Sequence, residues 1–258
     1  MKIINLVENT TSRQDVEAEH GLSLYIETEK HKILFDMGQT DLFAKNAKAV
    51  GLDLSQVDMA VISHGHYDHG GGLGKFLSIN KKAPIFISQY AFGDYYNGSG
   101  RYIGLDKSIK ECERLVFVGD EYKIDTGLCL YSCNQKERHH SLGAFGLTEK
   151  ADGEVVPDAF LHEQYLLIEE NGTRTLISGC SHKGIMDIVE WFSPDVLVGG
   201  FHFSKMPLGA ELVAAAIRLD SYDTEYYTCH CTGVEQYKFM KRYMKRLNYF
   251  SAGRTIYV

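Results

Sequence analysis

Three histidines and an aspartate fall within six residues of the stretch Ser63-His64-Gly65-His66-Tyr67-Asp68-His69-Gly70-Gly71-Gly72. Neutral imidazole and carboxylate are good protein ligands for zinc, manganese and iron. Four such groups exceed what one tetrahedral ion takes from a single loop while keeping a position open for water. The spacing therefore predicts a metal site, and it favours two ions over one.

The sequence on either side of this cluster predicts how it is held. Met59-Ala60-Val61-Ile62 is a buried-strand pattern, and Leu73, Phe76 and Leu77 begin a helical face. The cluster is therefore expected on a strand-to-helix loop, and ligands of open α/β sheets bind at the carboxyl ends of strands. The three glycines allow the loop to turn sharply.

Elsewhere the chain shows a mixed α/β pattern. Short β-type runs occur at 3–7, 22–26, 32–35, 59–62, 84–87, 165–168, 175–177 and 196–198. Apolar residues at helical spacing predict helices over 185–192, 208–219 and 237–247. Asn171-Gly172 predicts a tight hairpin turn, because both residues readily take positive φ angles. Hairpins come early in the chain, and strand-helix alternation comes late.

Length and composition predict one domain over residues 1–258. With 258 residues and 44% hydrophobic composition, the chain can bury a sizeable core. The stretch at about 90–160 is rich in Gly, Tyr and charge, and we expect a variable insertion that covers the substrate. The alternative is a surface elaboration that does not contact substrate.

Composition also bears on compartment and partners. No apolar run approaches the roughly 18 residues of a membrane span, and the N-terminus lacks signal-peptide form, so a soluble, cytoplasmic protein is expected. The six cysteines form no evident disulfide framework and read as reduced thiols. A net charge of −7 argues against a nucleic-acid backbone binder, although a local basic pocket remains possible. The expected partner is a small-molecule substrate, and the oligomeric state is left open.

The stretch His64-Gly65-His66-Tyr67-Asp68-His69 resembles the HxHxDH signature of the metallo-β-lactamase superfamily. That family has an αββα sandwich fold, in which two mixed β-sheets are flanked by helices and the metal centre lies at one edge. Further segments resemble one branch, the dihydropterin ribofuranosylaminobenzene phosphate synthase-like metal-dependent hydrolases. They are AEHGLS at 18–23, ILFDMG at 33–38, GCSHKGI at 179–185, GGFHF at 199–203 and CHCTG at 229–233.

The resemblance implies a set of metal ligands. His64, His66 and His182 would hold the first ion, and Asp68, His69 and His230 the second. His182 and His230 come shortly after the β-type runs 175–177 and 225–228, which is where ligands of a site at the carboxyl ends of strands are expected. The implied cofactor is one or two divalent ions, zinc foremost, with manganese or iron as alternatives.

One position departs from the superfamily pattern. Gly179-Cys180 stands where many members have Gly-Asp, whose carboxylate bridges two metals. Cys180 either binds metal as a thiolate or packs beneath the site as a small apolar residue, and packing is favoured. Without the bridging carboxylate, it stays open whether the second site is filled.

Other residues of these motifs are expected to support the chemistry. Asp36 matches a position that holds the ligand loop through hydrogen bonds. His20 and His202 are expected in the pocket, where they would hydrogen-bond a substrate anion or a developing oxyanion, with purely structural roles as the alternative. Asp68 and His202 are the catalytic candidates. Cys229 and Cys231 flank His230, but only the histidine is expected to bind metal.

These features together predict a metal-dependent hydrolase that uses a metal-activated water on a small anionic substrate bearing a phosphate or carbonyl group. One alternative is a di-iron redox enzyme of the same fold. The cysteine in place of the bridging aspartate, and the lack of flavodoxin-like sequence, argue against it. The other alternative is a metal-bound sensor without turnover.

Overall fold

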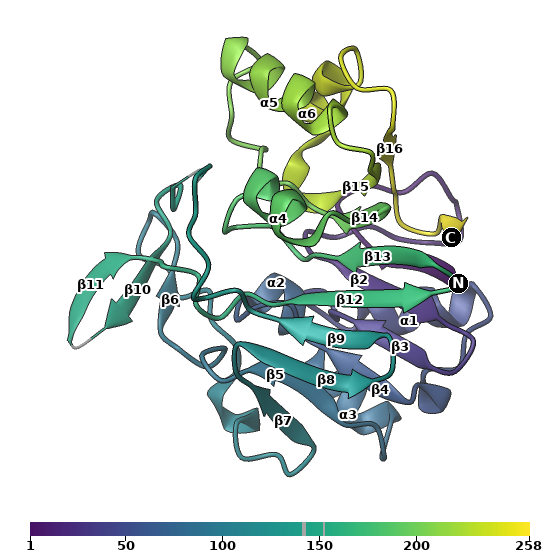
Figure 1. Ribbon diagram of the computed structural model, residues 1–258. Coiled ribbons are helices and arrows are strands. Elements are labelled where there is room, and N and C mark those ends of the chain that lie inside the picture. The colour runs from purple at the N-terminus through teal and green to yellow at the C-terminus, as the bar shows by residue number, and fades with distance from the viewer. Residues whose placement is uncertain (141–142, 152) are drawn as a thin grey trace.

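The computed structural model describes residues 1–140, 143–151 and 153–258. This part of the chain contains two seven-stranded mixed sheets packed face to face, with helices on their outer faces (Figure 1). The arrangement confirms the predicted fold class, an αββα sandwich of two mixed sheets.

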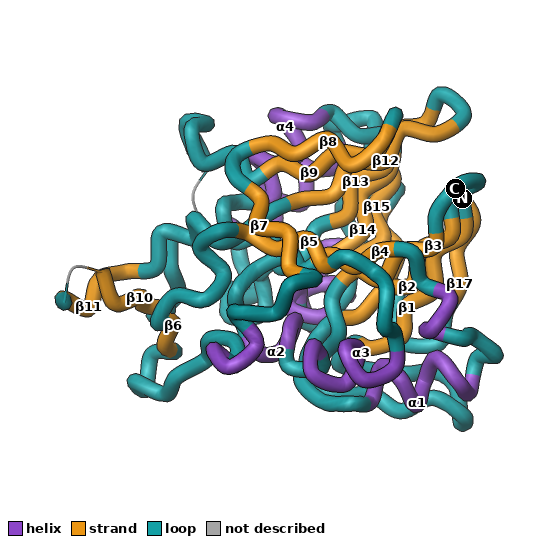
Figure 2. The backbone as a smooth tube through the Cα atoms, turned by 90° about the horizontal axis from the view of Figure 1, so that it is seen from below, coloured by secondary structure: helices purple, strands orange, loops and turns teal. Residues whose placement is uncertain are grey.

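The first sheet has the strand order β17-β1-β2-β3-β4-β5-β7. Neighbours from β17 to β3 are antiparallel, whereas those from β3 to β7 are parallel. Helices α1 (Leu42–Ala49), α2 (Tyr67–Gly70) and α3 (Leu73–Ile79) lie along its outer face (Figure 2). The strands are β1 (Lys2–Val7), β2 (Ser23–Glu27), β3 (Lys32–Phe35), β4 (Met59–Val61), β5 (Ile85–Ser88), β7 (Leu115–Val118) and β17 (Thr255–Tyr257).

The second sheet has the strand order β16-β15-β14-β13-β12-β9-β8. Its half from β13 to β16 is parallel, and helices α4 (Ile185–Phe192), α5 (Ala210–Asp220) and α6 (Val234–Met240) accompany that half. The strands are β8 (Glu121–Asp125), β9 (Leu128–Tyr131), β12 (Tyr165–Glu170), β13 (Thr173–Ile177), β14 (Val196–Gly199), β15 (Glu225–Thr228) and β16 (Leu247–Tyr249).

Because neighbouring side chains of a strand point to opposite faces of the sheet, the apolar residues form three core layers. Ile3 packs between the two sheets, whereas its neighbour Ile4 packs toward the first set of helices. Ile177 likewise faces the inter-sheet core, and Leu176 faces the second set of helices. Successive side chains of a strand point to opposite faces, so sheets buried on both faces need the near-continuous apolar runs seen in this sequence.

The stretch at 90–160 contains two kinds of structure. Strands β6 (Tyr95–Tyr96), β10 (Thr148–Ala151) and β11 (Glu154–Pro157) form a small sheet that projects from the sandwich (Figure 1). The same stretch also supplies β7, β8 and β9 to the two large sheets. Its role as a cover over the substrate, and the single-domain organisation, stay predictions.

Two helix predictions extended too far. Leu208 precedes α5 and is 49% exposed, so it takes no part in the apolar stripe of that helix. The third helix, α6, ends at Met240, and a turn follows it. Leu247 lies beyond that turn as the first residue of β16, where it is buried. The hairpin turn at Asn171 and Gly172 is confirmed by φ angles of 53° and 79°.

Three further findings concern the chain as a whole. The six cysteines are free thiols, as predicted. Among the described residues, no helix combines the length and apolarity that crossing a membrane requires. The short η-helices are η1 (Leu54–Gln56), η2 (Lys107–Ile109) and η3 (His230–Thr232), and the last of these begins at a predicted ligand.

Candidate metal centre

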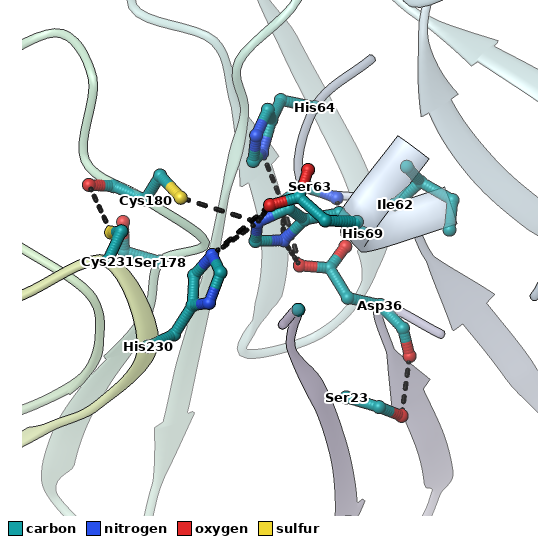
Figure 3. Close-up of polar contacts among 12 residues, drawn as sticks. Ser23, Asp36, Ile62, Ser63, His64, His69, Ser178, Cys180, His230 and Cys231 are labelled. Atoms are coloured by element: carbon teal, nitrogen blue, oxygen red, sulfur yellow. Dashed lines mark hydrogen bonds and ion pairs between the residues drawn. The ribbon is translucent and has the colours of Figure 1, made fainter. Parts of the chain in front are cut away.

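The predicted ligands lie at one edge of the sandwich, where strands from both sheets end. His64 follows β4, His182 follows β13 and His230 follows β15. These three strands run parallel to a neighbour in their sheets, so their carboxyl ends carry loops that can meet. Figure 3 shows His64, His69 and His230 converging from these loops.

A first group brings together His64, His66 and His182, each with one ligand atom within 4.8 Å of the others. All three are at least 96% buried, and His64 Nε2 lies 3.3 Å from His182 Nε2. Burial, reinforced by the neighbouring imidazoles, holds the pKa of His64 and of His182 well below the usual value. Both rings are therefore neutral, which is the form that binds a metal ion.

A second group brings together His20, Asp68 and His230 within the same limit of 4.8 Å. Asp68 Oδ2 lies 3.1 Å from His20 Nε2 and 3.4 Å from His230 Nε2. His69 joins them, because its Nε2 lies 3.2 Å from His230 Nε2 and 3.8 Å from Asp68 Oδ2. His20, predicted as a pocket residue, thus also lies within reach of an ion in this group.

Asp36 holds the ligand loop from below with hydrogen bonds to both of its carboxylate oxygens. Ser63 donates its backbone N–H to Oδ1 and its hydroxyl to Oδ2, both at 2.7 Å, and His69 Nδ1 lies 2.6 Å from Oδ2 (Figure 3). Asp36 is fully buried and takes a positive φ of 58° at the end of β3. The bond to Nδ1 leaves His69 Nε2 free to face the centre.

The charges of this second group are set by close contact. Burial would raise the pKa of Asp68, but His69 and hydrogen bonds from His20 and His230 bring it well below the usual value. Burial would likewise lower the pKa of His69, but the carboxylates of Asp36 and Asp68 raise it to about 9. At neutral pH the metal-free protein therefore carries a protonated His69 beside an ionised Asp68.

This protonation predicts a pH-dependent metal affinity. An ion that binds His69 must displace its proton below pH 9, and has none to displace above it. We expect the affinity of the second group to rise by about tenfold per pH unit from pH 7 to pH 9, and then to level off. Chelator-competition titrations at fixed ionic strength measure this slope. A flat affinity over that range would contradict the assignment of His69.

Sequence reasoning missed three residues that brace the first group, namely Asp158, His162 and Glu163. His162 accepts the Gly65 N–H at Nδ1 over 2.9 Å and has Nε2 3.1 Å from Asp158 Oδ2. Asp158 Oδ2 also lies 3.6 Å from His66 Nε2, so it can orient that ring. The signal was a histidine three residues before the apolar run 165–168, just past the stretch treated as variable.

Glu163 fixes the backbone that carries His182. Its carboxylate accepts the N–H of His182 at 2.7 Å, the N–H of Lys183 at 3.0 Å and the hydroxyl of Tyr165 at 2.6 Å. Lys183 is itself fully buried and donates to the backbone carbonyls of Ser132 and Glu163. Burial lowers the pKa of this lysine to about 8.

His230 is braced from the end of β1. Asn9 Oδ1 lies 2.8 Å from His230 Nδ1, and Glu8 accepts the His230 backbone N–H at 3.2 Å. Glu8 is fully buried although it carries a carboxylate. A polar pair directly after the first strand was the available signal, because that strand ends at the same edge of the sandwich.

Cys180 lies beside the ligands rather than beneath them. Its Sγ is 3.3 Å from His69 Nε2 (Figure 3), and one ligand atom each of His64, His69 and Cys180 lie within 4.8 Å. The placement puts the sulfur within reach of an ion, and its role as a ligand or as a packing residue stays a prediction. Burial raises the pKa of the Cys180 thiol.

A pocket of about 260 Å³ lies beside the two groups and is lined by His66, His182, His20, Asp68 and His230. His202 lines this pocket, with its ring centroid 4.3 Å from that of His182. Predicted substrate residues His20 and His202 thus share one pocket with Asp68. The wall includes Tyr67, Asn97, Ile103, Leu147 and Lys205, three of which come from the 90–160 stretch.

Gly179 offers a test of how closely the two ligand loops pack. A methyl group there would stand 2.2 Å from Ser63 Oγ and 3.1 Å from His64 Nδ1, so the loops would have to separate. We expect Gly179→Ala to weaken metal binding by about 10–100-fold, the range for disturbing groups that orient a ligand. Gly119→Ala, where nothing lies within 4 Å, is the control. Equal metal affinities in the two variants would contradict this packing.

Comparison with known proteins finds a matching family model and similar proteins. A family model described as the metallo-beta-lactamase superfamily matches residues 16–216. The chain is 30% identical to an uncharacterised protein of Methanocaldococcus jannaschii, over 98% of both chains. It is 29% identical, over 93% of this chain and 90% of the other, to that organism's 7,8-dihydropterin-6-methyl-4-(beta-D-ribofuranosyl)-aminobenzene-5'-phosphate synthase.

A solved structure extends this likeness to the whole fold. The crystal structure of Tm1679, described as a metal-dependent hydrolase of the beta-lactamase superfamily, matches with a TM-score of 0.84 and 30% identity. The match covers 100% of this chain and 99% of that one.

Proposed function

Because the chain belongs to the metallo-β-lactamase superfamily, we propose that it is a metal-dependent hydrolase of a small-molecule substrate. The observation that supports this best is the meeting of two ligand groups from three loops beside one pocket. His64, His66 and His182 would hold one divalent ion, and Asp68, His69 and His230 a second, with zinc as the foremost candidate.

The donor set fits such ions. The Nε2 atoms of two neutral imidazoles, His64 and His182, lie 3.3 Å apart in a buried site, which is close enough for one cation to accept a lone pair from each. The Nε2 atoms of His69 and His230 lie 3.2 Å apart beside an ionised carboxylate, and an ion there would replace the proton that His69 carries in the metal-free protein. A divalent ion, when bound, polarises a carbonyl or phosphoryl oxygen and lowers the pKa of water toward neutrality.

The protein's own side chains would direct the attack. Asp68 is ionised and faces the pocket, so it can accept a hydrogen bond or the proton of the attacking water. His20 and His202 line the same pocket and would donate hydrogen bonds to the substrate. The 90–160 stretch supplies Asn97, Ile103 and Leu147, which would exclude water from the bound substrate.

An anionic substrate fits the pocket rim. Lys205 lines the pocket, and its ammonium group donates to the Phe145 carbonyl at 3.2 Å. Its charge would be available there to a phosphate or carboxylate of the substrate. The phosphate in the name of one relative's product is of the same chemical class.

The test is a substrate panel with a chelator arm. A phosphodiester, a phosphomonoester, a thioester and a lactone are each incubated with the protein, then again after chelation and after zinc is restored. We expect hydrolysis of at least one anionic compound, loss of that activity with chelator, and its return with zinc. Chelator-resistant turnover, or no turnover of any class by fully loaded protein, would count against the proposal.

A further inference from the structure

A third cluster of metal-binding side chains lies at the pocket, beyond the two groups assigned above. One ligand atom each of Cys180, His202 and Cys231 lie within 4.8 Å of one another. Cys180 follows β13, His202 follows β14 and Cys231 follows β15, three adjacent parallel strands. The cluster is thus assembled from the carboxyl ends of neighbouring strands, where α/β proteins place ligands.

The backbone around this cluster is shaped to bring the three side chains together. His202 takes a positive φ of 56°, which is uncommon for a non-glycine residue. Gly200 must lack a side chain, because a methyl group there would stand 2.3 Å from Cys231 Sγ. Cys231 Sγ in turn lies 3.4 Å from the Cys180 carbonyl oxygen (Figure 3). The two sulfur atoms themselves lie within 4.8 Å of each other.

His202 also has an unused buried nitrogen. Within the described residues its Nδ1 is inaccessible to solvent and has no hydrogen-bond partner. The two cysteines are at least 94% buried. Buried polar atoms without partners are uncommon in folded proteins and call for an explanation such as an ion.

We propose that Cys180, His202 and Cys231 bind a third divalent ion of the thiophilic class, such as zinc, cobalt or cadmium. Two thiolates would balance the charge of such an ion. Tetrahedral zinc has bonds of about 2.3 Å to sulfur and about 2.0 Å to nitrogen, which suits three ligand atoms that lie within 4.8 Å of one another. All three residues line the pocket, so the fourth coordination position would open into it.

Filling this site would compete with the hydrolytic centre. Cys180 is shared with His64 and His69, and His202 is the residue proposed to contact substrate. An ion on the thiols would therefore withdraw His202 from the substrate, so an excess of zinc should inhibit. This consequence rests on the proposed function, whereas binding of the third ion does not.

Cobalt titration of the metal-free protein tests the site directly. Cobalt bound by thiolate shows a charge-transfer absorption in the near ultraviolet, which histidine and carboxylate sites lack. We expect about three equivalents to bind with this absorption, and His202→Ala or Cys231→Ser to bind one fewer and lose most of it. Cys112→Ser, a half-buried cysteine packed against the first sheet, is the matched control.

Several results would overturn the third site. They are binding of only two equivalents by the wild type, an absorption unchanged in Cys231→Ser, or one lost only in Cys180→Ser. The last result would place Cys180 in the two-ion centre alone. None of them would remove chelator-sensitive hydrolysis, so failure of this site and failure of the proposed function are distinguishable.

Alkylation of the unmodified protein provides a second readout in case a variant does not fold. Iodoacetamide labelling is followed by peptide mass spectrometry, with and without saturating zinc. We expect zinc to suppress the labelling of Cys180 and Cys231 together while Cys112 is unaffected. Protection of Cys180 without Cys231 would refute the shared site.

Discussion

His182→Ala is expected to lose one tightly bound ion per chain and nearly all hydrolytic activity. The ring supplies a buried nitrogen 3.3 Å from His64 Nε2, and the methyl group of alanine cannot replace it. Removing groups that merely orient a ligand costs about 10–100-fold in metal affinity or activity, so loss of a direct ligand should exceed about 100-fold. Metal analysis by mass spectrometry and assays on the substrate found in the panel measure both losses.

The control for this variant is His31→Ala, which removes an imidazole paired with Asp125 away from the pocket. The fold of His182→Ala should survive, because its core is apolar and extensive, although the loss of bound metal lowers thermal stability. Circular dichroism checks this point. Full metal content together with a normal rate in the folded His182→Ala protein would show that His182 is not a ligand.

Asp36→Asn is expected to combine a large loss of stability with weaker metal binding. Asparagine tolerates the positive φ at this position and can still accept the Ser63 N–H. Its amide NH₂ would face the Ser63 hydroxyl and His69 Nδ1, which both need an acceptor. Because the site is fully buried, we expect a loss of about 3 kcal/mol or more in the free energy of unfolding.

The same change should weaken the binding of the second ion by about 10–100-fold, because His69 loses the partner that orients it. Denaturant unfolding of metal-free protein and chelator competition measure the two effects. Asp53→Asn is the control, since Asp53 caps a short helix at the surface. A stability within about 0.5 kcal/mol of wild type would mean that Asp36 is not the support described.

The sequence was most informative where the chemistry is local. Three histidines and an aspartate in six residues already point to a metal loop, and a strand pattern before it gives its place at a sheet edge. His182 and His230 could be added only through the family resemblance, because spacing alone does not say which distant strand ends meet. The structure brings both to the loop, and also brings His20 closer to the ligands than expected.

Features that depend on packing between distant segments were not predictable. The bracing of His66 and Gly65 by Asp158 and His162 joins residues about 90 to 100 positions apart, and no local pattern encodes it. Cys180 was expected to pack under the site, because buried cysteines usually do, and that role stays a prediction. Its contact with His69 depends on how two loops from different sheets meet. The helix predictions failed at Leu208 and Leu247 because apolar spacing continues past the helix ends.

The central claim is that two groups of side chains at one pocket hold metal ions. Crystals of the protein grown with zinc, measured at and below the zinc absorption edge, test it most directly. We predict anomalous peaks within bonding distance of His64, His66 and His182, and of Asp68, His69 and His230. Fully loaded crystals without a peak at either group, or with peaks only at surface residues, would contradict the account.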